Sequence, residues 1–213
     1  MRQMSADEKR IAAMLVRMFL YVGVLVSVVV AQWKIAACLG ADSMKEDGLV
    51  EDLQVGVLVT ACLVYSVGAW RIGEWRPLLI GIAALSAACA VRECDYIFDH
   101  LIPVISWKFC YLFIIAALIY MWKRREQVRR LLPCFVSSGS FVLLFSVVIL
   151  IIPAAQCVGH RAFVADAIGL QANEETAILA RRALEEPLEL VGYVLILLSG
   201  IEFYASRLWQ RSR

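Results

Sequence analysis

The stretch IAAMLVRMFLYVGVLVSVVVAQ at residues 11–32 decides the fold class, because its only charged residue is Arg17. A helix needs about 20 predominantly apolar residues to cross the hydrocarbon of a bilayer. The apolar region of a secretory signal is shorter, about 7–15 residues. The stretch therefore predicts a transmembrane helix.

Five more apolar runs follow, at about 53–70, 78–98, 103–122, 131–152 and 188–206. Hydrophobic residues make up 62% of the 213-residue chain and charged residues 19%, against about 45–50% and 25% in soluble domains. We therefore expect an all-α integral membrane protein, one transmembrane domain over 1–213 built as a bundle of about six transmembrane helices. Residues 174–186, with Asn173 as N-cap, predict a short interfacial helix before the last span, and Pro187 predicts a break between them. The Ser137–Ser140 patch inside 131–152 predicts a helix contact.

The distribution of charge predicts the orientation. Segments 1–10, 71–77, 123–130 and 207–213 hold thirteen of the 21 lysines and arginines, whereas segments 33–52, 92–108 and 154–186 hold thirteen of the 19 acidic residues. Basic loops face the cytoplasm in membrane proteins. With six spans, both termini are expected in the cytoplasm, and the membrane is expected to be a bacterial inner (cytoplasmic) membrane.

The densest polar cluster lies at the predicted outer end of the third span. Residues three and four apart are neighbours on a helix, so Arg92, Asp95 and Asp99 share one face, and Glu93 and His100 share the adjacent one. Ionisable groups in such a place need partners. Candidates are Lys108, beside Trp107 in the fourth span, and Glu185, Glu186 and Glu189 at the start of the sixth.

Two interpretations of this cluster stay open: a rim of salt bridges that fixes helix packing, or a site for a ligand, an ion or a reaction. For a reaction, the candidate acids or bases are Glu93, Asp95 and Glu189. The candidate substrate-binding residues are Arg92, Asp99, Trp107, Lys108, Glu185 and Glu186.

A second pair is predicted inside the apolar runs. Arg17 lies about two turns into the first span and Glu202 about one turn into the sixth, at similar depth from the cytoplasmic side. We expect a structural ion pair between them.

Metal, cofactor and disulfide signals are weak. The two histidines, His100 and His160, are weak candidates for a metal site with a nearby carboxylate, but no HExxH-like spacing supports one, and no cofactor is predicted. Seven cysteines form no CxxC pair. Cys38, Cys94 and Cys157 are expected on the external side, where a disulfide can form, although the spacing favours no particular pair.

Three classes of function remain. A net charge of +2 without a basic stripe excludes nucleic acid as a partner, and no P-loop or GxSxG motif is present. The leading expectation is a non-enzymatic membrane component, a partner-binding subunit or small sensor, surrounded by lipid and binding a protein partner or a second copy. The alternatives are an enzyme acting on a lipid or lipid-linked substrate at the external face, with a lipid as ligand, and a small transporter or ion-handling protein. A transporter needs a polar path from Glu189 towards Arg17 and Glu202, and neither that path nor broken helices are apparent in the apolar runs.

Overall fold

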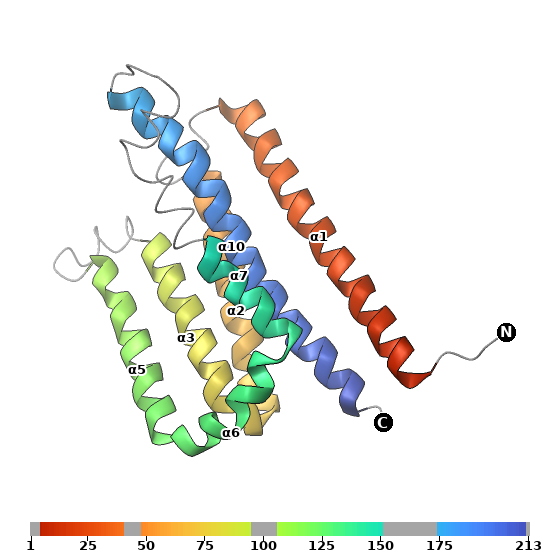
Figure 1. Cartoon of the computed structure of the whole chain (residues 1–213). Coiled ribbons are helices and arrows are strands. Elements are labelled where there is room, and N and C mark those ends of the chain that lie inside the picture. Colours follow the sequence, from red (N-terminus) through yellow and green to blue (C-terminus); the bar gives the residue numbers. More distant parts are fainter. Residues whose placement is uncertain (1–4, 41–47, 95–105, 151–173, 212–213) are drawn as a thin grey trace.

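The computed structural model describes residues 5–40, 48–94, 106–150 and 174–211, and within these ranges the regular structure is helical (Figure 1). By length and composition, four of the described helices can cross a membrane, and five if one bent pair counts as a single span. The all-α class and the apolar, membrane-type helices are thus confirmed for the described residues, whereas the count of six spans is not.

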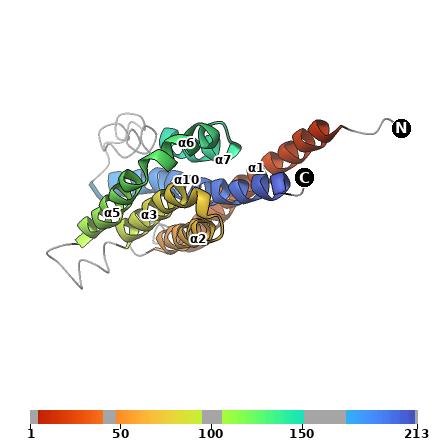
Figure 2. The same cartoon turned by 90° about the horizontal axis from the view of Figure 1, so that it is seen from below.

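Helix α1 (Ala6–Leu39) stands at the edge of the bundle (Figures 1 and 2). It begins with a capping box, in which the Ser5 hydroxyl accepts from the Glu8 N–H and the Glu8 carboxylate accepts from the Ser5 N–H. It packs chiefly against the last helix. Among its described side chains, only Tyr21 and Gln32 are buried.

The next two helices form a hairpin. Helix α2 (Leu49–Arg71) leads through the short turn η2 (Gly73–Trp75) into α3 (Arg76–Glu93). Pro77 lies in the first turn of α3, where the missing N–H costs nothing. The third span predicted at 78–98 matches α3 as far as Glu93, and residues 95–98 lie outside the described residues.

The chain returns through η3 (Ser106–Phe109) and α5 (Cys110–Lys123). With 14 residues, α5 is shorter than the roughly 20 that cross the hydrocarbon. It covers most of the predicted 103–122 span, of which residues 103–105 are not described.

The span predicted over 131–152 contains a sharp bend in the structure. Helices α6 (Arg125–Val136) and α7 (Gly139–Ile149) meet at 87°. The reason is local: the Ser138 hydroxyl donates to the Phe135 carbonyl at 2.6 Å and accepts from the Phe141 N–H at 3.3 Å, so it caps α7 instead of continuing α6. The serine patch predicted as a helix contact therefore holds the break, while Ser140 alone is buried against another helix.

The separate interfacial helix predicted over 174–186 is wrong. Helix α10 (Glu174–Arg211) runs through Pro187 without a break. The preceding ETAILARRALEE is rich in alanine, leucine, arginine and glutamate, all strong helix formers. Their preference outweighs the one hydrogen bond that the proline removes.

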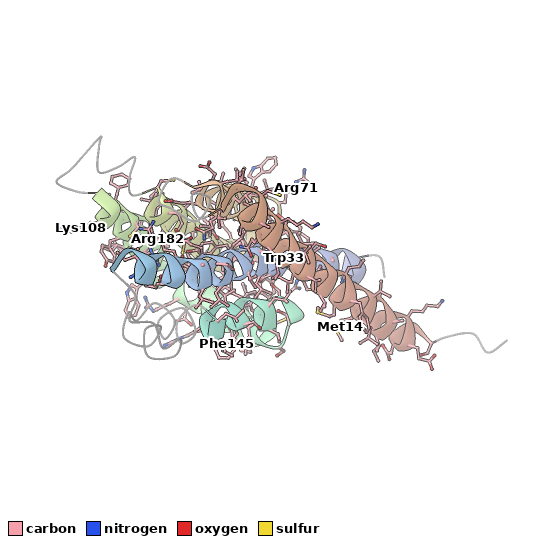
Figure 3. All side chains as sticks on the ribbon, turned by 90° about the horizontal axis from the view of Figure 1, so that it is seen from above. Met14, Trp33, Arg71, Lys108, Phe145 and Arg182 are labelled. Atoms are coloured by element: carbon pink, nitrogen blue, oxygen red, sulfur yellow. The ribbon has the colours of Figure 1, made fainter. Side chains whose placement is uncertain are left out.

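Helix α10 is the central element of the bundle. It lies between the α2–α3 hairpin and α7, as Figure 2 shows, and Figure 3 places Arg71 of α2 and Phe145 of α7 on opposite sides of it. Packing is close: a Cβ on Gly200 of α10 would lie 2.9 Å from a methyl of Val64 on α2. The core between α2, α3 and α10 includes Leu58, Tyr65, Leu79, Ile82, Tyr193, Ile196 and Phe203.

The helices of the bundle share two ends, the termini end and the far end. The start of α1, the end of α10, η2 and the α5–α6 junction lie together at one end, the termini end (Figure 1). The opposite end, where α3 and α1 finish and α5 and α10 begin, is the far end.

Candidate functional site

Polar side chains line α10 at three levels, beginning with an ionic cluster at the far end. Arg92 of α3 places Nη2 3.3 Å from Oε1 of Glu189 on α10, and its Nε lies 3.9 Å from Oε1 of Glu93. Tyr193 donates its hydroxyl to the same Glu93 oxygen at 2.6 Å. Both carboxylates are at least nine-tenths covered, whereas the Arg92 side chain is 55% exposed. The cluster therefore ties α3 to α10 and presents its cation outward.

A second set of contacts at the far end joins α2 to α10. Gln54, buried in α2, donates to Oε2 of Glu186 at 2.8 Å and to the Glu186 carbonyl at 3.2 Å. Glu185 pairs along the helix with Arg181 at 3.3 Å. These carboxylates hold α10 to α2 and to its own preceding turn.

Hydroxyl groups form the middle level. Tyr65 of α2 donates to Ser199 Oγ at 2.8 Å. Ser140 of α7 and Ser199 exchange contacts with each other's hydroxyl and carbonyl at 2.7–3.0 Å. All three side chains are buried. Sequence reasoning missed this cluster, because isolated serines and tyrosines inside apolar runs carry little signal.

The third level is the ion pair near the termini end. Arg17 donates from Nε to Oε2 of Glu202 at 2.8 Å and from Nη2 to Oε1 at 3.0 Å, and the Tyr21 hydroxyl donates to Oε2 at 2.9 Å. The contact predicted from the sequence is thus present in the structure. A Cβ on Gly139 would lie 3.7 Å from Glu202 Oε1. The carboxylate therefore also lies at the first turn of α7, where the helix dipole favours a negative charge.

A cavity of about 340 Å³ opens beside this ion pair, at the α6–α7 break. Sequence reasoning did not find it, because it exists only where α6 turns away from α7. Its lining comes from five elements: Met14, Arg17, Trp75, Cys134, Phe135, Ser137, Ser138, Gly139, Glu202, Phe203, Ser206 and Arg207.

The remaining candidates are placed as follows. Lys108 lies exposed in η3 at the edge of the bundle (Figure 3), and Trp107 belongs to the same short turn. Asp95, Asp99, His100 and His160 lie outside the described residues. Of the predicted far-end cluster, the structure thus brings together Arg92, Glu93 and Glu189, and holds Glu185 and Glu186 one turn away. The catalytic and substrate-binding roles assigned to these residues stay predictions.

Among the described residues, the structure shows neither a metal site nor a disulfide. Within the described ranges, no group of three histidine, cysteine or acidic side chains is arranged to hold a metal ion. Cys38 and Cys94 form no disulfide with a described residue, and Cys157 lies outside the described part of the chain.

Comparison with known proteins assigns no family to this chain. No family model matches it, and no curated protein or solved structure matches it either.

Proposed function

We propose that this chain is a multi-pass protein of a bacterial inner membrane, with both termini in the cytoplasm, and that it acts as a non-enzymatic component that binds a partner within the membrane. The bias of lysine and arginine towards the termini end supports this orientation. The paired polar groups support a scaffold role, because the ion pairs Arg17–Glu202 and Arg92–Glu189 and the hydrogen bond Gln54–Glu186 each fasten a different helix to α10.

The proposed partner-binding surface is the outer face of α1. Gly23, Ser27 and Ala31 recur every fourth residue, and all three are exposed. They line a shallow groove together with Phe19, Leu20, Val24 and Val28. Nothing lies within 4 Å of a Cβ placed on Gly23. Small residues at this spacing let a second transmembrane helix approach closely.

A second copy of α1 is the simplest occupant of this groove. The groove is lined by no charged side chain, so binding there requires no complementary charge on a different protein. Two identical stripes of small residues can pack against each other about a two-fold axis. In this account the far-end cluster and the Arg17–Glu202 pair hold the bundle rigid while α1 presents the groove.

The oligomeric state in lipid nanodiscs tests this proposal. Wild-type protein should run as a dimer, or as a defined complex with one other protein, by native mass spectrometry. Gly23→Leu should give the monomer with an unchanged unfolding midpoint, because the position is open within one copy. Gly56→Leu on α2, which is also exposed and open, is the matched control and should stay associated. A wild-type monomer with no bound protein contradicts the proposal.

The polar levels along α10 favour a second candidate, an ion-handling protein. Polar side chains occur at three levels of α10 from the far end towards the termini end: Glu189 and Tyr193 face α3, Ser199 faces α2 and α7, and Glu202 faces α1. Proteoliposomes containing a pH-sensitive dye test this candidate. Proton flux that Ser199→Ala reduces supports it, and flux equal to that of empty vesicles removes it.

A further inference from the structure

A groove between α2 and α10 opens on the outer side of the bundle. Leu63, Val67 and Ile201 within it are 59%, 44% and 43% exposed, so it faces the surrounding lipid. Its volume is about 390 Å³, within the range of small-molecule pockets, roughly 300–1,000 Å³. The residues from α2 recur at the three- and four-residue spacing of a single helix face, so the groove runs along the helices. The lining residues are Thr60, Leu63, Val64, Val67, Ile201 and Tyr204.

The polar groups of this lining are already engaged. The Thr60 hydroxyl donates to the Gly56 carbonyl at 2.7 Å. The Tyr204 hydroxyl reaches across α2 and donates to the Val64 carbonyl at 3.0 Å. This crossing needs Gly68, because a Cβ there would lie 2.7 Å from the Tyr204 hydroxyl. No charged side chain lines the groove, so its wall suits an apolar chain.

A cation lies at the termini end of the groove. Arg71 follows Val67 by one turn on the same face of α2 and ends the membrane-type segment Leu49–Arg71. Figure 3 shows it at the outer edge of the bundle. Among the described residues, no carboxylate lies within ion-pair distance of Arg71. The formal charges of Glu74 and Arg76 in the following turn cancel, so the positive charge of Arg71 remains.

The residue beside Arg71 places this end of the groove at the membrane surface. Trp70 is 74% exposed, and tryptophan is enriched where the hydrocarbon meets the headgroups. It lies three residues after Val67 and therefore borders the same face of α2. A ligand in the groove thus has its apolar part in the hydrocarbon and its end at the headgroup level.

The length of the groove matches one leaflet. From Thr60 to Arg71 the chain advances eleven residues, or about 16 Å at 1.5 Å per residue. The hydrocarbon core is about 30 Å thick, so one leaflet spans roughly 15 Å. A single acyl chain with its headgroup at Arg71 would extend to the midplane, where the groove ends. A partner helix would instead cross both leaflets.

We propose that this groove binds one anionic phospholipid from the leaflet at the termini end, with an acyl chain along α2 and α10 and the phosphate at Arg71. Basic side chains at the ends of transmembrane helices attract anionic headgroups. Binding here goes beyond partner binding by α1 and is independent of it, because the groove of Gly23 and this groove share no residue.

Titration of the detergent-purified full-length chain tests the proposal, with bound lipid counted by native mass spectrometry. Phosphatidylglycerol should bind saturably, one molecule per chain. Phosphatidylcholine has no net charge and should bind about fivefold more weakly, the ratio expected for one cation near an anionic headgroup. Equal binding of the two lipids overturns the proposal. Glycerol 3-phosphate carries the phosphate without acyl chains, and binding as tight as that of phosphatidylglycerol also overturns it.

Two pairs of variants locate the site. Arg71→Gln should weaken phosphatidylglycerol binding about fivefold, whereas Arg124→Gln, an exposed cation at the same end outside the groove, should change it less than twofold. Val67→Trp fills the groove and keeps Arg71, so it should abolish binding. Val59→Trp is its matched control, because Val59 lies on the same helix, is 46% exposed against 44% for Val67, and does not line the groove.

The filling variant also identifies the occupant. Wild-type affinity in Val67→Trp overturns the proposal, because the lipid would then bind elsewhere. A copurified protein that Val67→Trp loses, with no lipid bound to the wild type, shows that a partner helix occupies the groove and overturns the proposal as well. Both valines are exposed, so neither tryptophan disturbs the core of the bundle.

Discussion

Replacing Glu202 with glutamine should release α1 from the bundle. The carboxylate accepts two hydrogen bonds from Arg17 and one from the Tyr21 hydroxyl, at 2.8–3.0 Å. Side-chain exposure is 4% for Glu202 and 23% for Arg17. Glutamine keeps the size of the side chain but removes the charge, so the guanidinium stays within the apolar helices without its counterion.

The size of the effect follows from this burial. Removing one partner of a buried ion pair costs about 3–5 kcal/mol. Because Arg17 keeps some exposure and can extend towards the bilayer surface, we expect the lower limit, about 3 kcal/mol. At about 1.4 kcal/mol per factor of ten, the unfolding equilibrium shifts roughly 100-fold. Glu126→Gln is the matched control, because its pair with Arg129 is 75–78% exposed and contributes under about 1 kcal/mol.

The assay is reversible unfolding in mixed micelles, followed by helicity as the fraction of dodecyl sulfate rises. Glu202→Gln should lower the midpoint clearly, and Glu126→Gln should leave it nearly unchanged. The double variant Arg17→Met/Glu202→Met should recover most of the loss, because a buried ion pair can be replaced by apolar side chains at little cost. Equal midpoints for the two glutamine variants would show that the Arg17–Glu202 pair does not stabilise the bundle.

Three further predictions use the same unfolding assay. Gly200→Ala should cost about 1–3 kcal/mol, because its Cβ meets α2 at 2.9 Å, whereas Gly56→Ala, facing open space, should be neutral or stabilising; equal midpoints would contradict the close packing. Ser199→Ala removes the shared partner of two buried hydroxyls and should cost about 1–3 kcal/mol, and a cost below that of an exposed serine replacement would deny the cluster a stabilising role. Arg92→Gln should destabilise more than Glu189→Gln, because it leaves the buried carboxylate without its cation; the reverse order would argue against this pair.

Pairs of charged residues inside apolar runs were the most predictable part of the site. Arg17 and Glu202 stand out because few charges occur at that depth, and equal distance from the same membrane face brings them together. Arg92, Glu93 and Glu189 were predictable for the same reason. Their geometry was not, since the Tyr193 contact with Glu93 depends on how α10 rotates against α3.

A local cap explains the bend within the 131–152 span, and helix propensity explains the continuous α10. Hydrophobicity continues across 131–152, so it conceals a break that Ser138 makes by capping α7. At Pro187 the difference is reversed. The proline predicted a helix break, but the strong helix formers before it allow α10 to continue through that position. The cavity depends on the first of these features and was therefore beyond prediction from the apolar pattern.

Photo-cross-linking in native membranes shows whether α1 presents a surface to a partner. A benzophenone side chain at Leu20, in the groove of α1, is compared with one at Leu118 on α5; the two positions are 62% and 60% exposed. We expect one discrete adduct from Leu20, with the mass of two chains or of this chain plus one partner, and we expect Gly23→Leu to abolish it. From Leu118 we expect lipid adducts alone. Lipid adducts alone from both positions would contradict partner binding by α1.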